Sequence, residues 1–213
     1  MIVYWLLLLV TAFFAYLFGC MDTMILASNF VFHRNLRRLG DNKTWLSNFK
    51  RLYGPAGFLK LLAVELVKDL IPILIGSLLL GIRGHADAGR AFAGFVLVLG
   101  RLWPVLYRFQ GSHASIALVA AAFAVQTSAG AAVAVMLIAV TALTRYISLG
   151  TVVSAVVCLL VAVLVVDDAL LLRLLLMTAA LVLIKHIPAV IRIFQRTEPR
   201  LSLEEDITYK LDE

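Results

Sequence analysis

The chain has 213 residues, of which 62% are hydrophobic and 15% charged, and its mean hydropathy is +0.98. This composition excludes an ordinary soluble domain, and the length allows one compact bundle of membrane helices. The net charge of +6 lies between and after the apolar runs. It therefore indicates membrane topology and contact with anionic headgroups or phosphorylated substrates, and we expect no nucleic acid partner.

Seven apolar runs follow one another along the chain, and they predict an all-α, polytopic membrane bundle. The candidate spans are residues 2–27, 56–81, 90–107, 114–128, 130–143, 149–166 and 169–187. The fourth and fifth runs fall short of the roughly 20 residues that cross a bilayer squarely, so six spans with one broken hairpin remain an alternative. We expect a single domain over residues 1–200 and a short polar cytoplasmic tail over 201–213.

Basic residues gather in four segments that would all lie on one side of the bilayer. These segments are His33–Arg51, Arg101–His113, Arg145 and Lys185–Arg200. Cytoplasmic loops of membrane proteins carry such an excess of Lys and Arg. Seven spans then place the N-terminus outside and the C-terminus in the cytoplasm of a multi-pass plasma-membrane protein.

A few polar residues lie within or beside the apolar runs. Glu65 and Lys68 are three residues apart on one helix face, where they either pair with each other or serve a function. Ser148 is a candidate N-cap of the sixth span, and helix N-termini attract phosphate. Small residues crowd 114–134, which predicts either tight helix packing or a groove for a lipid tail.

Six segments, in order along the chain, carry a resemblance to a known family. They are Ala15-Tyr16-Leu17-Phe18-Gly19, Asn35–Gly40, Glu65–Pro72, Gly100–Val105, Thr144–Gly150 and Lys185–Glu198. With these segments the chain resembles the acyl-phosphate:glycerol-3-phosphate acyltransferases of the PlsY type, which are integral membrane enzymes of bacterial phospholipid synthesis. Thr144–Gly150 matches best, since it is nearly identical to the family's R-Y-x-S-L turn.

The chain also departs from the family's patterns where those patterns bind phosphate. The family's S-G-N-x-G-A-[ST]-N reads here as Asp41–Asn48, which has lost both glycines and the leading serine. The family's K-G-G-K-G reads as Gln110–Ala114, in which one glycine survives and His113 stands at the second lysine. Arg101 replaces a histidine and, with His113, offers a new positive or titratable group. These changes predict an altered acceptor or donor.

The resemblance implies a metal-independent and cofactor-free site at the cytoplasmic face. It would hold an acyl-phosphate or other lipid substrate and glycerol-3-phosphate or an altered acceptor, among membrane lipids. His113 and His186 are the candidate proton acceptors. The candidate ligands for substrate and phosphate are Ser47, Asn48, Arg51, Gly111, Arg145, Ser148, Arg37 and Lys68.

Two other classes of function compete with this hypothesis. The first is a catalytically inactive relative that binds lipid or a partner protein, which the lost motif positions would explain. The second is a transporter, which we rank last because, apart from Glu65 and Lys68, the spans lack the midplane charges and broken helices of a transport path.

Overall fold

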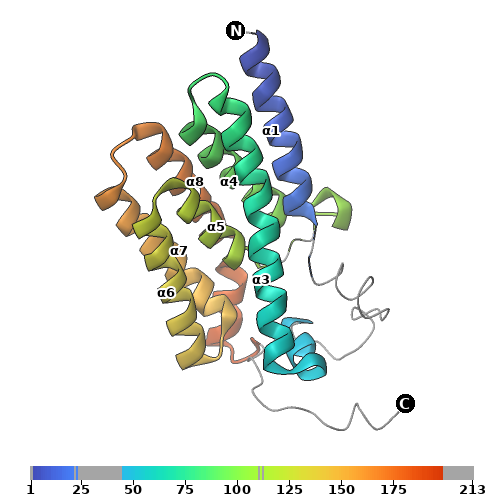
Figure 1. Cartoon of the computed structure of the whole chain (residues 1–213). Helices are drawn as coiled ribbons and strands as arrows, with labels where there is room; N and C mark the ends of the chain where they lie inside the picture. The colour runs from blue at the N-terminus through green and yellow to red at the C-terminus, as the bar shows by residue number, and fades with distance from the viewer. Residues whose placement is uncertain (1, 22, 24–44, 110, 112, 199–213) are drawn as a thin grey trace.

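The structure is a computed structural model that describes residues 2–21, 23, 45–109, 111 and 113–198, with only the backbone described at 45–58. These residues form seven α-helices and one short 3-10 helix (Figure 1). The elements are α1 (Ile2–Cys20), α3 (Trp45–Gly81), α4 (Ala86–Leu102), η1 (Val105–Tyr107), α5 (Ser115–Val125), α6 (Thr127–Thr144), α7 (Ile147–Val165) and α8 (Ala169–Phe194). The predicted all-α bundle is confirmed. Predictions for Arg37 and for the tail fall outside the described residues.

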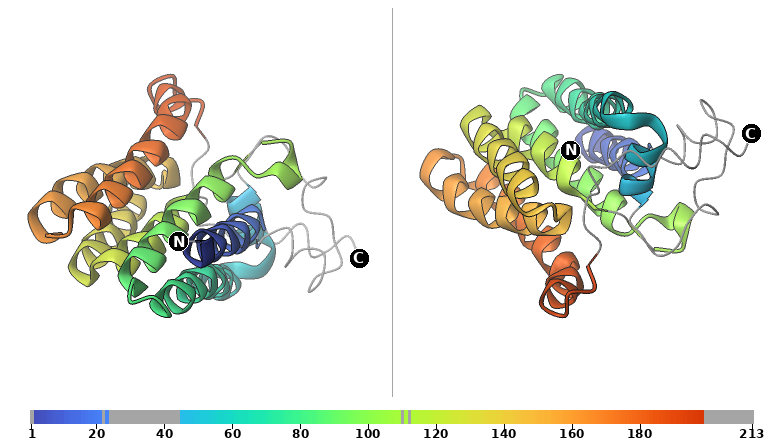
Figure 2. Two further views of the ribbon diagram at one scale, coloured as in Figure 1. Left: turned by 90° about the horizontal axis from the view of Figure 1, so that it is seen from above. Right: turned by 90° about the horizontal axis from the view of Figure 1, so that it is seen from below.

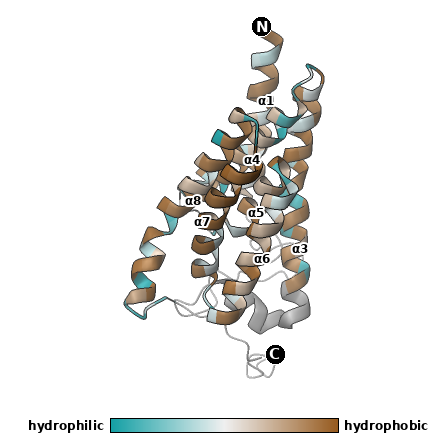
Figure 3. Cartoon of the chain, turned by 90° about the vertical axis from the view of Figure 1, so that its left-hand side faces the viewer, coloured by the Kyte–Doolittle hydropathy of each residue, from teal (hydrophilic) through white to brown (hydrophobic). Residues whose placement is uncertain are grey.

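Five stretches are long and apolar enough to cross a membrane, which makes the protein multi-pass as predicted. They are α1, Ala86–Tyr107, α6, α7 and α8. Large apolar side chains on the outer surface, such as Leu143, Leu164 and Phe194, are more than four-fifths exposed. Hydrophobic residues, brown in Figure 3, make up most of the length of these helices. Such a surface suits contact with lipid and not with water.

The helices form two groups with α5 between them. α1, α3 and α4 pack together on one side, and α6, α7 and α8 form a row on the other (Figure 2). α5 contacts helices of both groups, and nine of its eleven residues are buried. The small residues of this region therefore serve close packing: a side chain at Gly94 would press against Ala121. The structure favours this interpretation over a lipid-tail groove at α5.

Two helices extend beyond their predicted ends. α3 begins at Trp45 and not near residue 56, and α8 continues through Pro188 to Phe194. Both extensions are polar or contain proline, so hydropathy does not reveal them. Membrane helices tolerate proline where neighbouring groups satisfy the freed backbone. Both extensions are adjacent to candidate site residues.

The N-terminus of α8 is capped by Asp168. Its carboxylate accepts hydrogen bonds from the backbone N–H groups of Leu170 (2.8 Å) and Leu171 (2.9 Å). Because an N-cap contributes about 1 kcal/mol, we expect Asp168→Ala to lower the free energy of unfolding by about that amount. The unfolding midpoint in mixed detergent micelles measures the change. Asp167→Ala, at a neighbouring exposed carboxylate outside the cap, is the control, and an equal effect of both variants would contradict the assignment.

Candidate functional site

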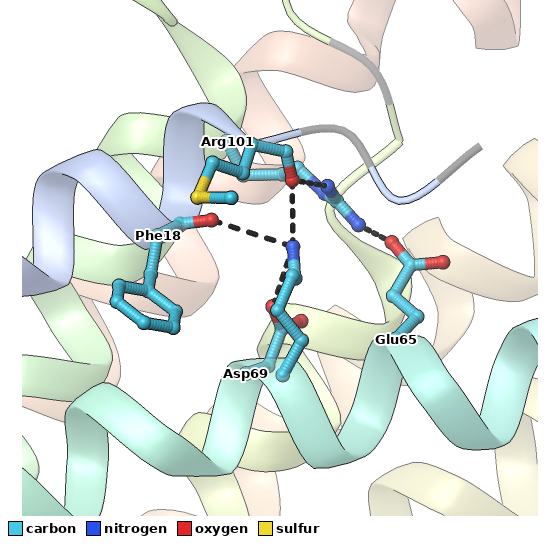
Figure 4. A network of polar contacts seen from close by, with 6 residues as sticks. Phe18, Glu65, Asp69 and Arg101 are labelled. Atoms are coloured by element: carbon cyan, nitrogen blue, oxygen red, sulfur yellow. Dashed lines mark hydrogen bonds and ion pairs between the residues drawn. The ribbon is translucent and has the colours of Figure 1, made fainter. Parts of the chain in front are cut away.

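Four buried charges surround the end of α1. Arg101 on α4 pairs with Glu65 on α3 and donates to the Met21 carbonyl oxygen at 3.2 Å (Figure 4). Lys68 pairs with Asp69 at 3.1 Å. Among the described residues, the network contains two positive and two negative side chains. Glu65 and Lys68 take different partners: Glu65 pairs with Arg101 of α4, and Lys68 pairs with Asp69, the next residue of α3.

Lys68 makes three polar contacts at the end of α1. Its ammonium has three N–H donors, and Nζ lies 2.7 Å from the Met21 carbonyl oxygen, 3.3 Å from that of Phe18 and 3.1 Å from Asp69. Only 9% of the residue is exposed. A cation at the C-terminal end of α1 is also favoured by the helix dipole. Lys68 therefore holds the end of α1 through these contacts, and its part in binding substrate stays a prediction.

Two histidines that are far apart in the sequence contact each other in the structure. His113 lies just before α5 and His186 lies on α8, and Nδ1 of His113 is 3.4 Å from Nε2 of His186. Their rings stack with centroids 5.6 Å apart. On its other side, Nδ1 of His186 is 2.8 Å from the carbonyl oxygen of Val182. His186 is 4% exposed, whereas His113 is partly exposed.

A second cluster of polar side chains connects α7 to the chain after α8. The Ser148 hydroxyl donates to Glu198, and Nε of Arg192 lies 2.7 Å from the other carboxylate oxygen of Glu198. The predicted N-cap role of Ser148 is wrong, because α7 begins at Ile147 with Tyr146 as its N-cap. An internal carboxylate thus lies at the N-terminus of α7, where the helix dipole favours negative charge.

Burial, more than the surrounding charges, keeps His113 neutral. Burial and the neighbouring His186 lower the pKa of His113 to about 4, and Arg192 and Arg101 act in the same direction while Glu198 opposes them. At pH 7 the ring is uncharged and can accept a proton. It cannot serve as a permanent positive charge for a phosphate.

Gly111 and Arg145 have unusual backbone environments. The place of a side chain at Gly111 is filled by the carbonyl oxygens of Arg101 and Leu102, so only glycine lets the loop lie against the end of α4. Arg145 is the C-cap of α6 in the left-handed region, with a φ of 61°. This conformation is uncommon for a residue with a side chain and is found at functional sites. Arg145 is exposed and lies three residues before Ser148.

The structure brings together part of the predicted site. His113, His186 and Ser148 lie at one end of the bundle, where Lys185 is 5.3 Å above the Trp103 ring and ties α8 to α4. Arg145 belongs to the turn that precedes Ser148. Ser47, Asn48 and Arg51 lie in the first two turns of α3, and their side chains are outside the described part.

Sequence reasoning assigned no role to Arg192 or Glu198. Glu198 is 5% exposed and contacts two other segments of the site. Its signal in the sequence was a single carboxylate in an otherwise basic stretch. Arg101 was a candidate anion ligand, but the structure places its guanidinium in the buried pair with Glu65.

Comparisons with known proteins match one family over most of the chain. The family model for glycerol-3-phosphate acyltransferase matches residues 9–196. The chain is 26% identical over 197 residues to a glycerol-3-phosphate acyltransferase of Thermoanaerobacter sp. (strain X514), covering 92% of this chain and 97% of the relative. It is 25% identical over 203 residues to the Staphylococcus aureus (strain Newman) protein of that name, covering 92% and 98%.

Two solved structures share the fold. The crystal structure of PlsY (YgiH), an integral membrane glycerol 3-phosphate acyltransferase, in its glycerol 3-phosphate form has a TM-score of 0.75 at 20% identity, covering 97% of this chain and 99% of that one. The lysophosphatidic acid form has a TM-score of 0.73 at 20% identity, covering 93% and 97%.

Proposed function

Since the chain belongs to the glycerol-3-phosphate acyltransferase family, we propose that it transfers a fatty acyl group from acyl-phosphate to a hydroxyl of glycerol-3-phosphate or of an altered acceptor. With glycerol-3-phosphate the product is lysophosphatidic acid. The bacterial relatives and the excess of Lys and Arg between and after the apolar runs of the sequence support a bacterial plasma-membrane protein with a cytoplasm-facing site. The observation that carries the proposal is the meeting of His113 and His186 next to Arg192 and Ser148.

The chemistry of this reaction fits the residues present. The acceptor oxygen attacks the acyl carbonyl carbon, the bond from that carbon to the phosphate oxygen breaks, and phosphate leaves with the bonding electrons. Acyl-phosphate is already activated, so the protein has to accept the hydroxyl proton, hold two anions and stabilise charge at the carbonyl oxygen. A neutral histidine suits the first task, and Arg51, Arg145 and Arg192 are candidates for holding the anions. Gly111, Ser47 and Asn48 remain candidate substrate ligands.

One observation favours a second candidate, an inactive relative that binds lipid or a partner protein. Three groups predicted to bind anions are engaged within the protein: Lys68 at the end of α1, Ser148 on Glu198, and Arg101 on Glu65. A substrate would have to bind beside these contacts and not through them. The two candidates differ in a single measurable property, which is turnover.

Acyl transfer by the purified protein tests the proposal. We expect product from long-chain acyl-phosphate with glycerol-3-phosphate, or with another member of a panel of hydroxylated acceptors, and we expect Arg51→Ala to abolish it because a phosphate countercharge is lost. Lys60→Ala, at an exposed cation on the same helix, is the matched control and retains activity. Folded protein that forms no product with any acceptor would favour the inactive relative.

A further inference from the structure

The hydrogen bond from His186 to Val182 defines which nitrogen of His186 carries a proton. A carbonyl oxygen only accepts, so Nδ1 of His186, 2.8 Å away, must be the donor. A second proton on Nε2 would make the ring a cation, and this residue is 4% exposed within α8. Burying that charge is costly, and the carboxylate that acts on this ring, Glu198, is already held by Ser148 and Arg192. We therefore assign to His186 the neutral form with a lone pair on Nε2.

The tautomer of His113 follows from that of His186. Nε2 of His186 has no proton to give, so across the 3.4 Å contact Nδ1 of His113 must be the donor. A neutral His113 with its proton on Nδ1 has its lone pair on Nε2. The direction of donation therefore runs from His113 to His186 and from His186 to the Val182 carbonyl.

We infer that His113 accepts the proton of the attacking hydroxyl on Nε2, and that His186 is a positioning residue that holds His113 in the required tautomer. This inference rests on the proposed acyl transfer and gives the two histidines different roles. In the reaction, the hydroxyl proton moves to Nε2 of His113 as the oxygen–carbon bond forms. The phosphate leaving group departs with its electron pair. A base oriented by a second group is a recurring arrangement in enzymes that activate hydroxyls.

The surroundings of His113 determine how this base depends on pH. His186 and Arg192 act on it from α8, Arg101 from α4 and Glu198 from the chain after α8, while Lys185 acts on its neighbour His186. In the free protein the pKa of His113 is about 4. An anionic substrate bound beside the ring favours the imidazolium and raises that pKa toward the ordinary value. The acid limb of kcat, which reports the complex, should therefore lie at higher pH than the acid limb of kcat/KM, which reports the free protein.

The alternative role of His113 is that of a countercharge, as the lysine in the family pattern K-G-G-K-G would suggest. His113→Lys separates the two roles, because a protonated lysine holds an anion but cannot accept a proton. If His113 is the base, this variant loses activity as severely as His113→Asn. If His113 is a countercharge, His113→Lys is at least as active as the wild type.

Nitrogen NMR of histidine in the full-length wild-type protein tests the tautomers without any assay. We expect Nδ1–H signals for both rings, and in His186→Leu we expect His113 to lose its tautomer preference. In acyl transfer, kcat should fall about 100-fold or more in His113→Asn. His186→Leu should also lose activity, while His186→Gln should retain most of it, because a glutamine oxygen can accept from Nδ1 of His113.

The possible outcomes distinguish this inference from the proposed function. An active wild type with the Nδ1–H tautomer at His113, an inactive His113→Asn and an inactive His113→Lys support the inference. An active wild type with Nε2–H at His113, or with an active His113→Lys, overturns the inference and leaves acyl transfer standing. A folded wild type that transfers no acyl group overturns the proposed function itself.

Discussion

Arg101→Leu is expected to lower the free energy of unfolding by about 3–5 kcal/mol, because it leaves Glu65 buried without its guanidinium partner. The same substitution removes a donor from the Met21 carbonyl at the end of α1. Glu65→Leu should cost a similar amount, since Arg101 would then lack its carboxylate in the same buried position. Unfolding by SDS in mixed micelles, followed by helical circular dichroism, measures both variants.

The double variant measures the interaction between Arg101 and Glu65 apart from what each residue contributes alone. When both partners become leucine, neither member of this pair is left buried without the other, and such replacements are often neutral or stabilising. We therefore expect the double variant to keep nearly the wild-type stability, so that its loss falls short of the sum of the two single losses by about 6–10 kcal/mol. Additive losses would contradict a direct ion pair between α3 and α4. Arg90→Leu, which breaks the more exposed pair with Asp87, is the matched control and should have a small effect.

The sequence was sufficient for the bundle because apolar length is a local property. Residues 149–166 and 169–187 predicted α7 and the membrane part of α8 within a few residues, since a bilayer demands a continuous run of apolar side chains. The start of α3 was not predictable in this way. Trp45–Arg51 is polar enough to be a loop, and its helical state depends on context beyond local hydropathy.

The sequence could not predict which polar side chains pair, for a different reason. Spacing on one helix suggested that Glu65 and Lys68 pair, but the structure pairs Glu65 with Arg101, 36 residues further along the chain. His113 and His186 were singled out separately, and only the packing of the α5 start against α8 shows that they touch. Helix order in space, which no local pattern encodes, decides such contacts.

Gly111→Ala is expected to abolish most of the acyl transfer while leaving the helical content intact. A Cβ at residue 111 would overlap the carbonyl oxygens of Arg101 and Leu102 closer than real Cβ atoms approach backbone, so the loop would have to move away from α4. His113 lies two residues further on and would be displaced from His186. Because a misplacement of about 1 Å can cost about 100-fold in rate, we expect a loss of at least that size in kcat.

Gly81→Ala is the matched control for this variant. The added methyl would meet Ala86 at 3.5 Å, which is ordinary van der Waals contact, and Gly81 ends α3. If Gly111 serves only stability, Gly111→Ala would lower the unfolding midpoint but keep the activity of the folded fraction and the Nδ1–H signal of His113. If the loop positions the base, as we propose, activity and the His113 tautomer are lost together. Equal activity of both glycine variants would show that the contact between the loop and α4 does not position His113.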